Sequence, residues 1–207
     1  WSARFDTPTD LETGYYMLAT GSRLADGSVL ANVSFLNIGP NRTTETDLPM
    51  RDNSEAVRVI GSFNSESKFI DARTGRETSV LLTAGRGYFV VGLVGVGQEP
   101  TDHALKDIAA KAAELEQWGR SIILLFPDET AYAKYAASPA ASLPQTVTFG
   151  IDRDGSVRRR ILEAMQLPGN VSLPVFLIGD TFNRVVFESH GYTIGLGDRL
   201  LHTIHQL

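Results

Sequence analysis

Apolar and polar positions alternate along residues 1–84, and no stretch there has the 3.6-residue period of an amphipathic helix. Residues 15–20 and 29–38 have the alternating pattern of strands, and the Asp26-Gly27 pair between them is a strong hairpin signal. The same pattern predicts further short strands at 57–60, 68–70 and 79–83, with a turn at 71–76. Short strands separated by frequent turns indicate a β-sandwich or a part of one.

From residue 85 onward the pattern changes to an alternation of strands and helices. Tyr88–Val94 is almost wholly apolar, which is typical of a strand buried on both faces. The segment 100–118 has an apolar stripe at helical spacing, and Thr101 or Asp102 is able to cap its start. Further strands are predicted at 121–126, 146–150, 174–178 and 184–188, and further helices at 128–137, 156–167 and 196–207. This order predicts an α/β domain in which parallel βαβ units precede a β-hairpin and a closing helix.

The composition excludes several classes of function. The chain has 207 residues, and its 43% of hydrophobic residues suffices for a sizeable core. Nineteen Lys and Arg against twenty-four Asp and Glu give a net charge of −5, whereas a dedicated nucleic-acid-binding protein presents a basic field. The chain has no cysteine, so its own side chains form no disulfide, no thiolate metal site, no cysteine nucleophile and no dithiol redox pair.

The start of the chain has none of the features of a targeting signal. It begins at Trp1 without an initiator methionine, a basic region or an apolar signal segment. We therefore expect a mature product or a fragment of a longer protein. The longest apolar run, 88–96, is interrupted by Gly92 and Gly95 and is far shorter than the roughly 20 residues of a membrane helix. We expect no membrane span in this fragment.

Two segments of the later half, Ser172–Asp180 and Phe187–Tyr192, resemble the second half of a thioredoxin-like domain. In that family a cis-proline begins the strand that faces the active site, and Pro174 holds the matching position. A cis bond is expected from the resemblance alone, because only about 5–6% of X–Pro bonds are cis. The resemblance covers residues 85–207. It implies a thioredoxin-like C-terminal domain, with a mixed central sheet flanked by helices, preceded by an all-β sandwich-like domain over 1–84.

A second resemblance concerns both halves and is carried by Gly14–Leu18, Ala25–Ala31, Gly85–Phe89, Gln98–Leu105 and Asp180–Phe187. These segments are similar to the C-terminal part of large secreted transglutaminase-like proteins of Bacteroidetes. In that group a transglutaminase core is followed by a β-rich domain and a thioredoxin-like tail. The similarity implies a periplasmic or cell-surface location and sister domains upstream. Transglutaminase chemistry needs a cysteine nucleophile, so any such centre is expected outside this chain.

The stretch between the first strand and the first helix of the later half decides the chemistry. Redox-active thioredoxin-like proteins place Cys-x-x-Cys there, because a helix N-terminus lowers the pKa of a thiol. Residues 97–103 hold this place without a cysteine, so we expect neither thiol–disulfide exchange nor an enzyme of that class. The simplest interpretation of the stretch is a capped helix start with Pro100 in its first turn. The residues expected to form a cleft or an interaction surface are Glu99, Pro100, Thr101, Asp102, His103, Leu173 and Pro174.

Three other patterns give weaker signals. His202 and His205 have a spacing able to bind a metal, but no carboxylate flanks them at ligand spacing, and a solvated face is the favoured interpretation. Gly92–Gly97 lies between a strand and a helix, as a dinucleotide loop does, yet Pro100 takes the place of the third glycine. Arg158–Arg160 fan around a predicted helix and do not form one basic patch. We expect no cofactor and no metal.

Two functions from different classes are consistent with these observations. The first is a non-catalytic, redox-inactive accessory or interaction module of a larger extracytoplasmic protein, which binds a sister domain or an extended peptide around Pro174. The alternative is a non-thiol ligand-binding or hydrolytic site in the cleft beside Pro174 that uses Glu99, Asp102 or His103. No nucleic-acid partner is expected under either hypothesis.

Overall fold

The computed structural model describes residues 14–23, 29–38, 51–52 and 57–207, and the chain divides into two units after Ala56. In the first unit, β1 (Gly14–Arg23) and β2 (Val29–Ile38) pair antiparallel, and β3 (Arg51–Asp52) pairs with β2. Both strands of the predicted hairpin are therefore confirmed. The predicted turn at 25–28 lies outside the described residues, and a β-sandwich in this part of the chain stays a prediction.

The second unit is built on one mixed sheet of eight strands. In sheet order the strands are β4 (Gly61–Ser62), β11 (Arg184–His190), β10 (Val175–Asp180), β7 (Tyr88–Leu93), β8 (Ile122–Phe126), β9 (Val147–Ile151), β5 (Lys68–Asp71) and β6 (Glu77–Ser79). β7, β8 and β9 are parallel, whereas β10 is antiparallel to β7 and β11 is antiparallel to β10. The central strands are buried on both faces, as their apolar sequences predict.

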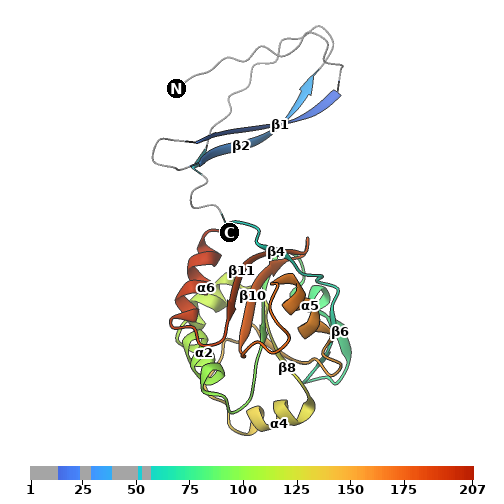
Figure 1. Cartoon of the computed structure of the whole chain (residues 1–207), viewed down its shortest axis with the longest axis vertical. Coiled ribbons are helices and arrows are strands. Elements are labelled where there is room, and N and C mark those ends of the chain that lie inside the picture. Colours follow the sequence, from blue (N-terminus) through green and yellow to red (C-terminus); the bar gives the residue numbers. More distant parts are fainter. Residues whose placement is uncertain (1–13, 24–28, 39–50, 53–56) are drawn as a thin grey trace. The chain divides into compact units, whose positions relative to one another are not determined.

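Six helices cover the two faces of this sheet. They are α1 (Val80–Ala84), α2 (Glu99–Ala110), α3 (Ala112–Trp118), α4 (Glu129–Ala137), α5 (Ser156–Ala164) and α6 (Leu196–His205). Figure 1 shows α2 and α6 on one side of the sheet and α5 on the other. The core under α2, α3, α4 and α6 includes Val90 and Phe176, while the core under α1 and α5 includes Val91 and Val175. Neighbouring strand residues thus face opposite cores, as the two-residue period of a strand requires. The order from β7 to α6 is the predicted one.

No helix among the described residues combines the length and the apolar character needed to cross a bilayer.

The boundary between the two parts of the chain differs from the predicted one at residue 84. β5 pairs with β9 through Ile70 and Ile151, and β4 pairs with β11 through Gly61 and Val185. Residues 57–84 therefore complete both edges of the large sheet, and the second unit begins at Val57 rather than at residue 85. The local pattern of short strands did not reveal this, because their pairing partners lie far away along the chain.

Two of the predicted short strands are wrong. Residues 57–60 are irregular, and the Ile60 N–H bonds to the carbonyl of Val185 (2.8 Å) just before β4 begins. The segment predicted as a strand at 79–83 is mainly helix α1, because the Ser79 hydroxyl accepts a hydrogen bond from the Leu82 N–H (3.2 Å) and caps the helix. The strand at 68–70 and the turn that follows it are confirmed.

The predicted helix at 100–118 is divided into α2 and α3. Lys111 separates them with a non-helical backbone (φ −111°, ψ 20°). α6 approaches closely at this point, since a Cβ on Gly197 would overlap the carbonyl of Asp107. Gly119 ends α3 in the left-handed conformation (φ 67°), which glycine adopts without steric penalty.

Candidate functional site

The loop between β7 and α2 holds the first group of predicted site residues. α2 begins at Glu99 behind Gln98, whose side chain makes no capping hydrogen bond, so the predicted cap at Thr101 or Asp102 is wrong. Thr101 lies inside the first turn and is buried, and its hydroxyl accepts a hydrogen bond from the Gly95 N–H (3.2 Å). This bond ties the first turn of α2 to the chain that leaves β7.

The second group of predicted residues lies beside the end of β7. The Leu173–Pro174 peptide bond is cis, as the resemblance implies. Pro174 is buried, and its carbonyl accepts a hydrogen bond from the Gly191 N–H (2.8 Å). The next residue, Val175, pairs with Leu93, the last residue of β7. The structure therefore brings Pro174 to the point where the loop to α2 departs.

An open cleft of about 300 Å³ lies at the C-terminal ends of β7, β8 and β9. Leu173 belongs to its apolar wall, together with Leu93, Val94 and Phe126. The charged part of the lining, called the charged wall below, comes from the turn between β9 and α5 and from Arg158 of α5. The carboxyl ends of parallel strands are where α/β proteins bind their ligands, so this cleft is the candidate functional site.

The charged wall is organised around a buried carboxylate. Asp152 directly follows β9 and is 5% exposed. Its two oxygens accept hydrogen bonds from the N–H groups of Val157 (3.0 Å) and Arg158 (2.7 Å) in the first turn of α5. Burial raises the pKa of Asp152, although these two bonds act in the opposite direction. Because the carboxylate already occupies the N-terminus of α5, this helix end does not serve an anionic ligand.

The two arginines that line the cleft also bind other groups of the protein. Arg153 forms an ion pair with Glu129 of α4. The Arg158 guanidinium donates to the carbonyl of Gly169 (3.1 Å). These contacts join the charged wall to α4 and to the segment that leads to Pro174. The charged groups described here therefore already have hydrogen-bond or ion-pair partners within the protein.

Replacing Asp152 with alanine is expected to lower the free energy of unfolding by about 1–3 kcal/mol, because two N–H groups of α5 lose their acceptor. Asp152→Asn keeps one acceptor oxygen and serves as the matched control. The pKa of Asp152 is higher in the folded protein than the ordinary value of 3.8. Wild-type stability relative to Asp152→Asn is therefore expected to fall as the pH rises through the folded-state pKa. Urea denaturation from about pH 3 to pH 7 measures this difference, and a wild-type advantage that grows with pH contradicts the raised pKa.

The remaining predicted residues lie outside the lining of the cleft. His103 stacks on the ring of Tyr192, with centroids 4.9 Å apart, and its Nε2 atom is 3.7 Å from Oδ2 of Asp107. Asp107 also accepts a hydrogen bond from the Leu196 N–H (3.0 Å), so this group of side chains joins α2 to the start of α6. Glu99 is exposed, whereas Pro100 and Asp102 are half-buried in the first turn of α2. Of the seven predicted residues, Leu173 lines the cleft.

Comparison with solved structures identifies the fold. The chain is similar to a DsbE-type thiol:disulfide interchange protein from Chlorobium tepidum, with 15% identity, a TM-score of 0.53, and coverage of 70% of this chain and 96% of that one. It is also similar to the bacterioferritin comigratory protein of Xanthomonas campestris (13% identity, TM-score 0.55, 72% and 100% coverage). For peroxidoxin BcpB from Mycobacterium tuberculosis the values are 14%, 0.56, and 72% and 97%.

The second unit has a thioredoxin-like fold. At these identities the likeness concerns the fold alone. The sequence matches no protein-family model and no curated protein. The thioredoxin-like unit keeps the cis-proline beside the end of β7, and no thiol stands opposite it, because the chain has no cysteine.

Sequence reasoning missed the charged wall of the cleft. The signal was nevertheless present, because Asp152-Arg153-Asp154-Gly155 begins two residues after the end of the strand predicted at 146–150. Residues that follow parallel strands gather at one edge of a sheet, which is where ligands bind in open α/β folds. Placing Leu173 beside this turn requires knowledge of the sheet order, which the local pattern does not contain.

Proposed function

We propose that the thioredoxin-like unit is a redox-inactive binding module that holds an extended peptide segment in the cleft beside Pro174. The observation that carries the proposal is the retention of the cis-proline and of a cleft at the strand ends in a chain without cysteine. Thiol–disulfide exchange needs a thiolate, which no side chain of this chain supplies. Without thiol–disulfide exchange, the function that this fold would still provide is binding at the cleft.

The lining of the cleft supports binding rather than hydrolysis. Leu173 is half-buried and is the apolar residue of the lining that a bound segment would contact, whereas Leu93 and Phe126 are almost wholly buried at the base of the cleft. Asp152 already accepts two hydrogen bonds from α5. Among the described residues that line the cleft, there is no serine, histidine or lysine that would form a nucleophile–base pair.

The proposal extends to the surroundings of the module. The segments similar to the tail of secreted transglutaminase-like proteins support a place within a larger extracytoplasmic protein, in the periplasm or at the cell surface. The bound segment would then come from a sister domain of the parent protein or from a separate extended peptide. In either case the module contributes affinity, and chemistry would reside elsewhere.

Blocking the apolar wall tests the proposal. Displayed random 12-residue peptides are selected on the full chain, and binding of the enriched peptides is measured by fluorescence anisotropy. Leu173→Arg places a long charged side chain in the wall and is expected to weaken binding at least about tenfold, or about 1.4 kcal/mol. Ser172→Arg adds the same group at an exposed neighbouring position and is expected to change binding less than about twofold. An enriched pool in which no peptide is weakened more by Leu173→Arg than by Ser172→Arg, or no enrichment at all, would refute a peptide-binding cleft.

A further inference from the structure

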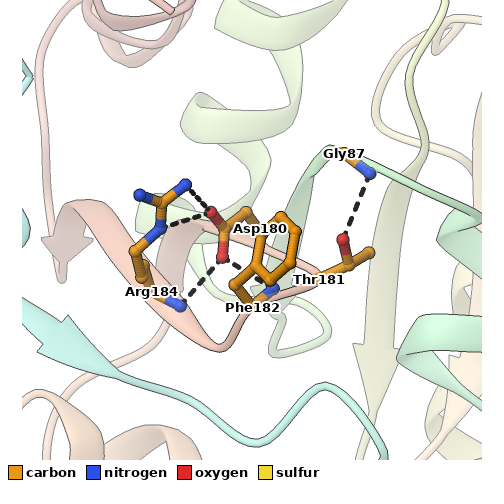
Figure 2. A network of polar contacts seen from close by, with 5 residues as sticks. All are labelled: Gly87, Asp180, Thr181, Phe182 and Arg184. Carbon is orange, nitrogen blue, oxygen red and sulfur yellow. Dashed lines mark hydrogen bonds and ion pairs between the residues drawn. The ribbon is translucent and has the colours of Figure 1, made fainter. Parts of the chain in front are cut away.

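The opposite end of the sheet carries a rigid hairpin turn between β10 and β11. Asp180, the last residue of β10, is 2% exposed and accepts hydrogen bonds from the N–H groups of Phe182 and Arg184 (both 2.9 Å). Thr181 donates its N–H to the Gly87 carbonyl (3.1 Å) and accepts the Gly87 N–H at its hydroxyl (3.4 Å). Figure 2 shows the bonds that Asp180 accepts and the bond from the Gly87 N–H to the Thr181 hydroxyl. The turn is therefore ordered before any partner arrives.

This turn presents a large aromatic side chain to solvent. Phe182 is 79% exposed, and the guanidinium of Arg184 lies 5.7 Å from the centre of its ring (Figure 2). Arg184 is fixed by its ion pair with Asp180, in which Nη2 and Oδ2 are 2.6 Å apart. Phe182 therefore adds nothing to the core. A preorganised aromatic side chain loses little conformational entropy when it becomes an interface contact.

Two further arginines lie next to this turn. The Arg120 guanidinium donates to the carbonyl of Arg86 (3.0 Å), and it lies against Gly87, where a Cβ would be 3.4 Å from its central carbon. Among the described residues, neither Arg86 nor Arg120 forms an ion pair. Arg86, Arg120 and Arg184 together with the carboxylate of Asp180 carry a summed formal charge of +2, in a chain whose net charge is −5.

We propose that Phe182, Arg184, Arg120 and Arg86, together called the Phe182 surface, bind an acidic peptide segment that carries an aromatic or aliphatic residue. Arginines pair with carboxylates through their planar donors, and Phe182 supplies the apolar contact of such an interface. Aromatic residues and arginine are also the types enriched at the centres of protein interfaces. A nucleic acid fits less well, because single-strand binders use an extended basic groove with several stacking rings.

The Phe182 surface is separate from the cleft beside Pro174. Asp180 pairs with Tyr88 at the start of β7, whereas Val175 pairs with Leu93 at its end. The two surfaces therefore occupy opposite ends of the same strands. The proposal for the Phe182 surface does not depend on the cleft, and a variant of one surface leaves the other intact.

Differential peptide selection tests this proposal on the full chain. A displayed library of random 12-residue peptides is enriched on the wild-type chain and depleted on Phe182→Ala. The surviving peptides are expected to be rich in Asp and Glu and to contain an aromatic or aliphatic residue. In fluorescence anisotropy, Phe182→Ala is expected to weaken their binding about 10–30-fold, and Arg120→Glu about fivefold or more. Raising the salt concentration is expected to weaken binding further. Arg184 is left unchanged, because it neutralises the buried Asp180.

Two control variants, together with the cleft variant Leu173→Arg, distinguish binding at the Phe182 surface from binding elsewhere. Ile194→Ala removes another apolar side chain that is 78% exposed, and Arg76→Glu reverses another exposed arginine, so both are expected to change binding less than twofold. Thermal melts of all variants confirm that they fold. Peptides indifferent to Phe182→Ala, an absence of enriched peptides, or a preference for basic peptides or single-stranded DNA would each overturn the proposal. Peptides sensitive to Leu173→Arg but not to Phe182→Ala would report the cleft and not this surface.

Discussion

Replacing Phe176 with alanine is expected to lower the free energy of unfolding by about 3–5 kcal/mol, because the change leaves a cavity that the surrounding side chains fill only in part. Phe176 lies on the central strand β10 and is fully buried in the core that includes Leu105 and Leu200. Its cross-strand partner is Gly92 on β7, and its ring occupies the space that a side chain on Gly92 would need. Denaturant unfolding of the full chain, followed by circular dichroism, measures the loss.

A double-mutant cycle tests whether the predicted loss comes from the contact between Phe176 and Gly92. Gly92→Ala alone is expected to destabilise the protein by about 1–3 kcal/mol, because its methyl group would overlap the ring of Phe176 and a methyl of Leu124. Combined with Phe176→Ala, the same methyl group enters vacated space, so the double variant is expected to lose less than the sum of the single losses. Gly169→Ala is the control, since a Cβ there meets no atom within 4 Å. Strict additivity of the two changes would contradict this packing.

The central strands and the order of elements could be predicted from the sequence because burial on both faces leaves a local signature. The run of apolar residues in Ile122–Phe126 indicates such a strand without knowledge of its neighbours. The segment Val80–Ala84 shows the limit of this reasoning. A short apolar run is compatible with a strand or a buried helix, and the hydrogen bond from the Leu82 N–H to Ser79 decides in favour of the helix.

The domain boundary and the cleft could not be predicted, because both depend on contacts between distant parts of the chain. β4 is two residues long, and its place beside β11 is set by pairing across more than one hundred residues. The cleft likewise joins the end of β7, the turn after β9 and Leu173. The cis bond before Pro174 was predicted from resemblance to a family and not from any local pattern. His103 was expected at a cleft or an interaction surface from the same resemblance, and its ring stacks on Tyr192.

Introducing cysteines in the first turn of α2 is expected to change the chain from inactive to active in thiol–disulfide exchange. Gln98 is the N-cap residue of α2 and Thr101 lies three residues later, which is the spacing of Cys-x-x-Cys at a helix start. Gln98 is exposed and Thr101 is buried, so a cysteine at position 98 would be accessible to solvent while one at position 101 would be buried. The helix N-terminus is expected to lower the pKa of the first thiol into the range of roughly 3.5–7.5.

Insulin reduction in the presence of a small dithiol measures this gain with the Gln98→Cys/Thr101→Cys variant of the full chain. The wild-type chain is expected to give no rate above background, since it has no sulfur nucleophile. Gln98→Cys alone lacks a resolving thiol, and Gln98→Cys/Asp102→Cys moves the second thiol one residue around the helix, so both are expected to react far more slowly. A double variant no faster than Gln98→Cys would show that the β7–α2 loop has lost the geometry of a redox site along with its thiols. A fast double variant would show that the absence of cysteine alone separates this chain from thiol redox activity.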